Sequence, residues 1–269
     1  MDLNILISSH AMRPQSWNWR KDVVVSYNRK VLTNYDGIQE IYSWVQSVHE
    51  EADNRMVVHI KDMLEKCITN VQVHTLDTDV IVILLSFMAQ FNEINDSIRI
   101  VVDFGTGEFR RNISINHSFA ALGESVCLAL PFFHTFSGCD STCSFYQKTK
   151  KIWFESWMKY PNDEESQYKW SMLTTAFQQL SWLPSSDAIQ NNLTTIEKFL
   201  TFVYGQKDFS KLDDARFSMF SSSKSGNLRE LPPSQDALKL HILRSAFQAG
   251  WVWGNILCQK PILSKDLWG

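Results

Sequence analysis

The sequence predicts an α/β core built on a parallel sheet, followed by a mostly helical region. Residues 49–104 alternate between apolar patterns of helical spacing and short strand-like runs. Strands that alternate with helices favour parallel pairing, because the helix supplies the crossover. From Phe145 onward the apolar residues recur mainly at helical spacings. We therefore expect a core over residues 1–144 and a helical region over residues 145–269 that packs on it.

The elements of the predicted core follow in a simple order. Residues 22–27 favour a strand, and residues 49–67 favour a helix, with apolar side chains three and four positions apart. Residues 71–76 predict the next strand, and the apolar run 80–88 predicts a buried helix that is entered directly from it. Residues 98–104 predict a further strand, which a Gly-Thr-Gly turn ends.

The helical half contains one strongly marked helix and one expected loop. Residues 234–257 follow two prolines, and Ser234 is a good cap at the helix start. Residues 196–204 place apolar side chains on one helical face. The serine-rich stretch at residues 217–226 favours a mobile loop.

The composition limits the classes of function. The chain has 269 residues, of which 44% are hydrophobic and 13% aromatic, so we expect a sizeable core rich in large rings. The net charge of -3 argues mildly against strong non-specific DNA binding, since dedicated nucleic-acid binders are usually basic. A metal-dependent nuclease can be locally acidic, so the net charge does not exclude one.

The cysteines and the apolar runs bear on the compartment. Five scattered cysteines without a CxxC pair indicate reduced thiols in an intracellular protein. The longest apolar run, residues 80–89, is far shorter than the roughly 20 residues that span a bilayer. We expect no targeting segment and no membrane association, and a nuclear location if the role is directed at DNA.

Three acidic clusters carry the chemistry that the sequence suggests. They are residues 49–55 (HEEADNR) at a helix start, residues 76–79 (LDTD) at a strand end, and residues 134–141 (HTFSGCDS). Carboxylates at the carboxyl edge of a parallel sheet lie where such folds bind ligands. Because clustered carboxylates repel one another, they need cations, and hard cations such as Mg²⁺ prefer oxygen ligands. Two such ions about 3.5–4 Å apart can activate water against a phosphodiester.

Each cluster also has a purely structural interpretation. Acids in the first turn of a helix commonly interact with the helix dipole or cap the helix. Asp77 can cap the helix that follows it, and Asp140 can be another cap. Only the three clusters together, in this order, favour a metal site.

Five separated motifs resemble a family of uncharacterised animal proteins, many of them transposon-associated in appearance. The motifs are HEEADNR, VHTLDTDVIVILL, DFGTGEFRRNISI, LPFFHTFSGCDSTCSF and a C-terminal pattern that runs from LPPS to FQAG and WG. The family shows EEADTR, TxDTDVVVL, FGTG and a TGCDT segment in the same order. The resemblance covers most of residues 20–269.

That family in turn resembles the PIN-like flap-endonuclease and XPG nucleases, which have EAEA, DxD and GxDY segments. The resemblance implies a PIN-like α/β core, Mg²⁺ or Mn²⁺ as cofactor, and DNA or RNA as partner. It assigns the metal-binding and catalytic acids to Glu51, Asp53, Asp77, Asp79 and Asp140. It also implies that a helix-two-turn-helix element follows Asp140.

The sequence departs from the nuclease pattern at two places. Those nucleases carry further aspartates on an earlier strand and helix, for which Asp2 and Asp22 are the only candidates here, so we expect a fragment or a truncated copy. The glycine-rich Gly-Lys-Gly-Lys-Lys turn of the helix-two-turn-helix element is replaced by residues 147–151, which keep lysines but no glycine. Lys148, Lys150 and Lys151 either contact phosphate or form a solvated charge run.

The sequence leaves three functions open. The first is a metal-dependent nuclease, and the second is a non-catalytic module that binds nucleic acid or protein. The third is a relic reading frame of a mobile element. The ordered acidic motifs favour the first, whereas the missing early aspartates, the lost glycines and the mildly acidic pI of about 6.2 favour the second.

Overall fold

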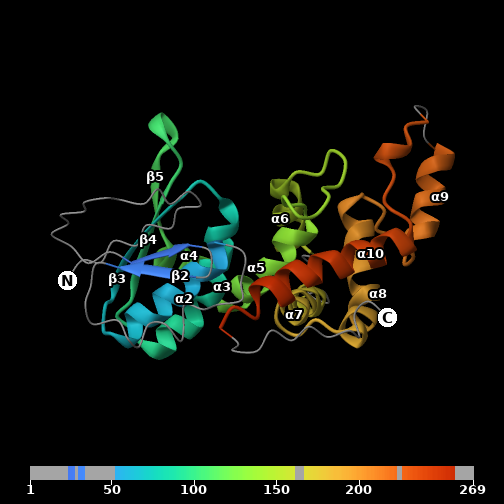
Figure 1. Ribbon diagram of the computed structural model, residues 1–269. Helices are drawn as coiled ribbons and strands as arrows, with labels where there is room; N and C mark the ends of the chain where they lie inside the picture. Colours follow the sequence, from blue (N-terminus) through green and yellow to red (C-terminus); the bar gives the residue numbers. More distant parts are fainter. Residues whose placement is uncertain (1–23, 28–29, 34–51, 161–166, 223–225, 258–269) are drawn as a thin grey trace. The chain divides into compact units, whose positions relative to one another are not determined.

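The computed structural model describes residues 24–27, 30–33, 52–160, 167–222 and 226–257. The chain is an α/β protein, with a small mixed sheet of three strands followed by a mostly helical region (Figure 1). It forms two compact units, and the boundary between them falls at Cys127 and Leu128, inside helix α5 (Glu124–Phe136). A short segment that begins at Ile256 also belongs to the first unit. The boundary expected near residue 144 stays a prediction.

The sheet of the first unit has the strand order β3-β4-β5. Strands β3 (Asn70–Thr75) and β4 (Arg99–Phe104) pair in parallel, which confirms the expected parallel pair. Strand β5 (Arg111–Ser114) pairs antiparallel with β4 and was not predicted. Its four residues contain a single apolar side chain, so they carry no strand pattern.

Alternating burial gives the sheet one apolar and one polar face. Val71 and Val73 of β3 are buried, whereas Gln72 and His74, the residues that follow them, are exposed. Successive side chains of a strand point to opposite faces, so this alternation is what a half-buried strand requires. The parallel register pairs His74 with Asp103 on the polar face.

Two helices complete the core of the first unit and define its carboxyl edge. Helix α2 (Ala52–Glu65) leads into β3 through four residues, β3 leads into α3 (Thr78–Ile94) through two, and the two helices pack on each other. A helix of 14 residues and a strand of six residues are each about 20 Å long. The start of α2 therefore returns to the edge where β3 and β4 end and where α3 starts.

Two further elements precede this core, and one follows it. Strands β1 (Val24–Tyr27) and β2 (Lys30–Thr33) form an antiparallel hairpin, and β1 confirms most of the strand expected over residues 22–27. Helix α4 (Ile115–Leu122) packs on α3 and β4. Its Asn116 side chain accepts the Ile100 N–H at 2.9 Å and donates to the Ile98 carbonyl at 2.8 Å, which fixes α4 on the sheet.

The second unit is helical around a core of aromatic rings. Its elements after α5 are α6 (Lys150–Met158), α7 (Gln167–Trp182), α8 (Ser186–Val203), α9 (Leu212–Ser222) and α10 (Gln235–Ala246). The rings that are fully buried here include Phe132, Phe136, Trp153, Trp157, Phe177 and Phe199. They contact one another at centroid distances of about 5 to 6.5 Å, which confirms the expected ring-rich core.

Helix α5 carries Pro131 in its interior, and neighbouring side chains compensate for it. Proline lacks an N–H and disturbs the helix around it. The Phe132 N–H donates to Ser181 Oγ at 3.0 Å, and Thr135 Oγ1 lies 3.1 Å from the Pro131 carbonyl.

Within the described ranges, no single helix is long and apolar enough to cross a membrane. Only the bent pair α4 and α5 together meets that test of length and composition.

The C-terminal helix and the expected loop differ from the prediction in detail. Ser234 caps α10 as expected, but residues 247–253 continue as a π-helical segment, η3 (Phe247–Trp253). A Cβ at Gly250 would lie 2.5 Å from Pro184 Cγ, so this segment packs too closely on the residues that follow α7 for a side chain. The loop expected over residues 217–226 is wrong for residues 217–222, which belong to α9. Residues 223–225 lie outside the described part of the chain.

Candidate metal centre

The Asp77-Thr78-Asp79 segment forms the turn from β3 into α3. Asp77 is the N-cap of α3, and its Oδ1 accepts the Asp79 N–H at 2.9 Å. The Asp77 N–H in turn donates to Thr75 Oγ1 at 3.0 Å. The structural alternative for Asp77 is therefore confirmed. Capping uses one carboxylate oxygen, and a carboxylate has two, so the cap is compatible with a metal ligand.

Asp79 differs from Asp77 in burial. Its residue surface is only 8% exposed, and it lies in the first turn of α3, where the N-terminal dipole favours a negative charge. Asp77 is exposed beside it. The structure thus brings these two predicted residues together at the carboxyl edge of the parallel pair, where folds of this class bind ligands.

The first acidic cluster reaches the same edge through α2. Asp53 is half-buried in the first turn of α2. Among the described residues, its carboxylate does not form a metal-sized group with those of Asp77 and Asp79. Glu51, the other acid predicted here, lies outside the described residues. Both Asp53 and Asp79 sit in first helical turns, so a dipole role and a metal role fit each of them.

Asp140 lies in the second unit, on the loop that follows α5. Gly138 bends this loop with a φ of +108°, and a Cβ there would lie 2.7 Å from Ser144 Cα. The Cys139 N–H donates to the Thr142 carbonyl at 3.3 Å, and Thr142 Oγ1 donates to the Thr135 carbonyl. The Gly-Cys-Asp-Ser-Thr motif is therefore a closed turn that leaves Asp140 exposed.

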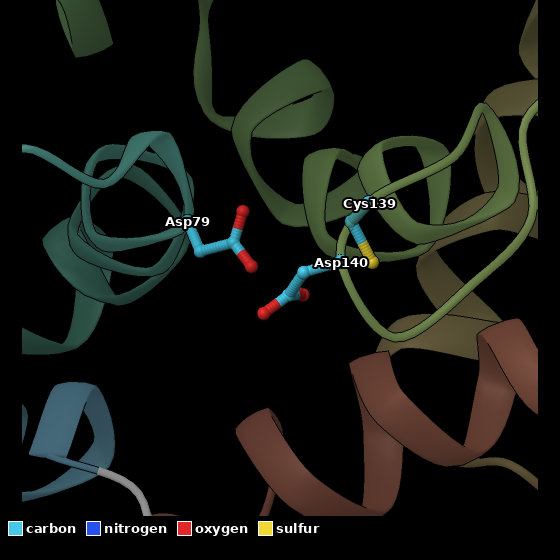
Figure 2. A group of neighbouring side chains, drawn as sticks. All are labelled: Asp79, Cys139 and Asp140. Carbon is cyan, nitrogen blue, oxygen red and sulfur yellow. The ribbon is translucent and has the colours of Figure 1, made fainter.

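Figure 2 shows the side chains of Asp79, at the start of α3, and of Cys139 and Asp140, on the loop after α5. Cys139 was not predicted as a ligand. Its Sγ lies 3.1 Å from Ser141 Oγ and 3.2 Å from Thr142 Oγ1, within its own loop. A thiolate is a soft ligand, whereas Mg²⁺ prefers oxygen, so Cys139 adds nothing to a magnesium site. The sequence pointed to Cys139 only through its position directly before Asp140, which is one of the predicted ligands.

A second polar group in the first unit was missed altogether. His74 Nδ1 lies 2.7 Å from Asp103 Oδ2, and Arg110 Nε donates to Asp103 Oδ1 at 2.7 Å. A second Arg110 nitrogen, Nη2, donates to Asp103 Oδ2. The hydrogen bond from Arg110 is the main reason that the pKa of Asp103 lies below its ordinary value. The available signal was an aspartate inside the apolar run IRIVVDF.

Two of the three predicted phosphate-binding lysines have partners within the second unit. Lys148 Nζ donates to the Val203 carbonyl at 3.2 Å, and it lies over the Tyr204 ring at 4.6 Å. Lys150 Nζ donates to the His134 carbonyl at 2.9 Å. Both carbonyls belong to the last turns of helices, which cations stabilise. Burial lowers the pKa of Lys148.

Lys151 has a more open setting than its two neighbours. Its side chain is 83% exposed, and Nζ lies 3.9 Å from Glu155 one helical turn away. An exposed pair at that spacing contributes little to stability, so Lys151 is available to an external anion. The predicted role of the three lysines in contacting nucleic acid stays a prediction.

Residues 147–151, which the resemblance aligns with a glycine-rich turn, include one left-handed backbone conformation. Gln147 adopts a φ of +55°, in the left-handed region that favours glycine. Thr149 is the N-cap of α6 with a φ of -71°, which any residue adopts, and its Oγ1 accepts the Ile152 N–H at 3.3 Å. Of the two positions where the resemblance implies a glycine, Gln147 therefore has a backbone conformation that favours glycine and Thr149 does not.

Comparison of the chain with models of protein families, with curated proteins and with solved structures finds no match.

Proposed function

We propose that this chain derives from a PIN-like, flap-endonuclease-like hydrolase and uses Mg²⁺ or Mn²⁺ to cleave nucleic-acid phosphodiesters. The observation that carries the proposal is the pair Asp77 and Asp79 at the carboxyl edge of β3 and β4, with Asp79 buried. Asp53 approaches the same edge from α2. Asp77 and Asp79 offer oxygen ligands of the kind that a hard cation needs, and Asp53 is the third acid that the resemblance assigns to the site.

The proposed roles follow from these positions. Asp53, Asp77 and Asp79 hold the cation, which when bound lowers the pKa of water and stabilises charge on a phosphoryl group. The cap between Asp77 Oδ1 and the Asp79 N–H fixes the Asp77 carboxylate before any ligand arrives, so less ordering is needed on binding. The resemblance also implies a metal-binding role for Glu51 and for Asp140.

A second candidate is a non-catalytic module that binds nucleic acid or protein. The observation that favours it is the engagement of Lys148 and Lys150 with the Val203 and His134 carbonyls. Lysines that stabilise helix ends are less available to a phosphate backbone, so this observation favours a module that binds protein over one that binds nucleic acid. The two candidates share the fold and differ in whether bound nucleic acid is cut.

Cleavage of flap and hairpin DNA in Mn²⁺ distinguishes the two candidates. We expect Asp77→Asn and Asp79→Asn to abolish metal-dependent cleavage while the chain stays folded. Asp96→Asn is the matched control, because Asp96 is an exposed aspartate of the same unit at the opposite edge of the sheet, before β4. Equal activity in all three variants contradicts the nuclease assignment. Binding of duplex without cleavage by the parent chain supports the non-catalytic module.

A further inference from the structure

A group of linked polar side chains lies on the polar face of the sheet and consists of His74, Asp103 and Arg110. They come from β3, from β4 and from the turn before β5, so only the folded sheet brings them together. Asp103 holds the group together, because its side chain is 2% exposed and accepts hydrogen bonds from both His74 and Arg110. The side chains of His74 and Arg110 are 62% and 60% exposed, so their outer parts face solvent.

Asp103 fixes which nitrogen of His74 is available. A carboxylate accepts hydrogen bonds only, so Nδ1 must carry the proton that it shares with Asp103. The remaining polar atom of the ring is Nε2, on the opposite side of the imidazole. When His74 is protonated, Nε2 donates outward and the ring forms an ion pair with Asp103.

Arg110 contributes donors beside this ring. A guanidinium has five N–H donors, and the bidentate contact with Asp103 uses two of them. Three donors are therefore left on a side chain that is more than half exposed. Because Asp103 holds both His74 and Arg110, their donors are ordered before a ligand binds, which reduces the entropic cost of binding.

The other groups around this cluster favour a small anion. Gln72 and Asn112 flank His74 and Asp103 on the polar face, and both are exposed. Two exposed acids lie nearby along the chain, Glu108 two residues before Arg110 and Asp77 three residues after His74. Arg111 lies over the Phe104 ring at 5.4 Å and adds positive charge next to Arg110.

We propose that His74 and Arg110 form a binding site for a phosphoryl oxyanion, with Asp103 as the positioning residue. Planar guanidinium groups and imidazolium donors are suited to phosphoryl oxygens. The ligand is either a terminal phosphate monoester or a backbone phosphodiester of a nucleic acid. The site needs no metal and no cleavage, so it stands or fails independently of the proposed nuclease activity.

The test is a titration of the isotope-labelled full chain with inorganic phosphate, followed by NMR of the histidine ring signals in the presence of EDTA. We expect a saturable shift of the His74 signal. His117 is the internal control, because it is an exposed histidine of the same unit on α4. Dimethyl phosphate tests the diester: a shift with it assigns the site to backbone phosphate, and a shift with inorganic phosphate alone assigns it to a terminal phosphate.

Variants make the assignment specific. Arg110→Gln should weaken phosphate binding about tenfold or more, because it removes charge-assisted hydrogen bonds. His74→Gln, at an exposed position, should weaken phosphate binding, which is then read from backbone amide shifts, while the rest of the backbone spectrum stays that of the folded chain. If Arg110→Gln unfolds the sheet, Arg110→Lys serves in its place, since it keeps the charge and loses the planar fork. Equal shifts at His74 and His117, or unchanged affinity in both His74→Gln and the Arg110 variant, overturn the proposal.

Discussion

Asp77 caps helix α3 by accepting the N–H of Asp79 at 2.9 Å, so one half of the DxD motif holds the backbone of the other half. Substitutions of Asp77 therefore distinguish its structural role as a cap from its proposed chemical role. Asp77→Ala should lower the free energy of unfolding by about 1 kcal/mol, because the cap is lost. Asp77→Asn should cost much less, since asparagine caps equally well. Urea unfolding of both variants measures the difference, and equal losses contradict the capping role.

The left-handed conformation of Gln147 predicts a stabilising substitution. A side chain at a φ of +55° is strained, and glycine relieves that strain while it adds freedom to the unfolded chain. We expect Gln147→Gly to raise the free energy of unfolding by up to about 1 kcal/mol. Gln147→Ala is the control and should give no such gain. A loss of stability in the glycine variant would show that the Gln147 side chain matters more than its backbone.

Gly138 and Gly123 form a matched pair for the loop after α5. Both have a positive φ, but a Cβ at Gly138 would lie 2.7 Å from Ser144 Cα, whereas nothing lies within 4 Å of one at Gly123. Gly138→Ala should therefore cost roughly 3 kcal/mol, and Gly123→Ala roughly 1 kcal/mol. Thermal unfolding gives both values. Equal costs mean that the close contact at Ser144 is relieved by a small shift of the loop.

Buried His241 predicts a loss of stability in mild acid. Burial lowers its pKa below the ordinary value of 6.5, and its Nε2 lies 2.8 Å from the Phe136 carbonyl. Below about pH 6.5 the unfolded chain takes up a proton that the folded chain resists, so stability is full above that pH. It declines as the pH falls from 6.5 through the lowered pKa of the folded state. His59 in the first unit has a pKa lowered for the same reason.

Urea unfolding at pH 7.5, 6.5 and 5.5 measures this effect. His241→Gln should reduce the loss between pH 6.5 and 5.5, even if it lowers stability at all three values. His117→Gln is the control, because His117 is exposed and should leave the pH dependence unchanged. An unchanged pH dependence in His241→Gln contradicts the assignment.

The elements that sequence reasoning predicted correctly are those with a strong apolar period. Helices α2 and α3 and strands β3 and β4 were expected in this order, and the parallel pairing followed from the alternation. Strand β5 could not be predicted, because its Arg-Asn-Ile-Ser sequence has no period and its pairing with β4 comes from the turn before it. Helix α9 was missed for a similar reason, since its serines and acids resemble a loop.

The candidate site was predictable only where residues are neighbours in sequence. Asp77 and Asp79 share one turn, so their proximity was foreseeable from the DxD spacing. The contact between His74 and Asp103 depends on the register of two strands, which a single sequence does not reveal. The partners of Lys148 and Lys150 are carbonyls 55 and 16 residues away, and no side-chain pattern marks them.

Calorimetric titration of the purified chain with Mn²⁺ tests the central claim most directly. We predict saturable binding that Asp79→Asn removes and that Asp96→Asn leaves unchanged. That result would mean that the carboxyl edge of the parallel pair binds a divalent cation through the acids assigned to it. No binding by the parent chain, or equal binding by both variants, would contradict a metal centre at this edge and would leave Asp77 and Asp79 as residues that stabilise the start of α3.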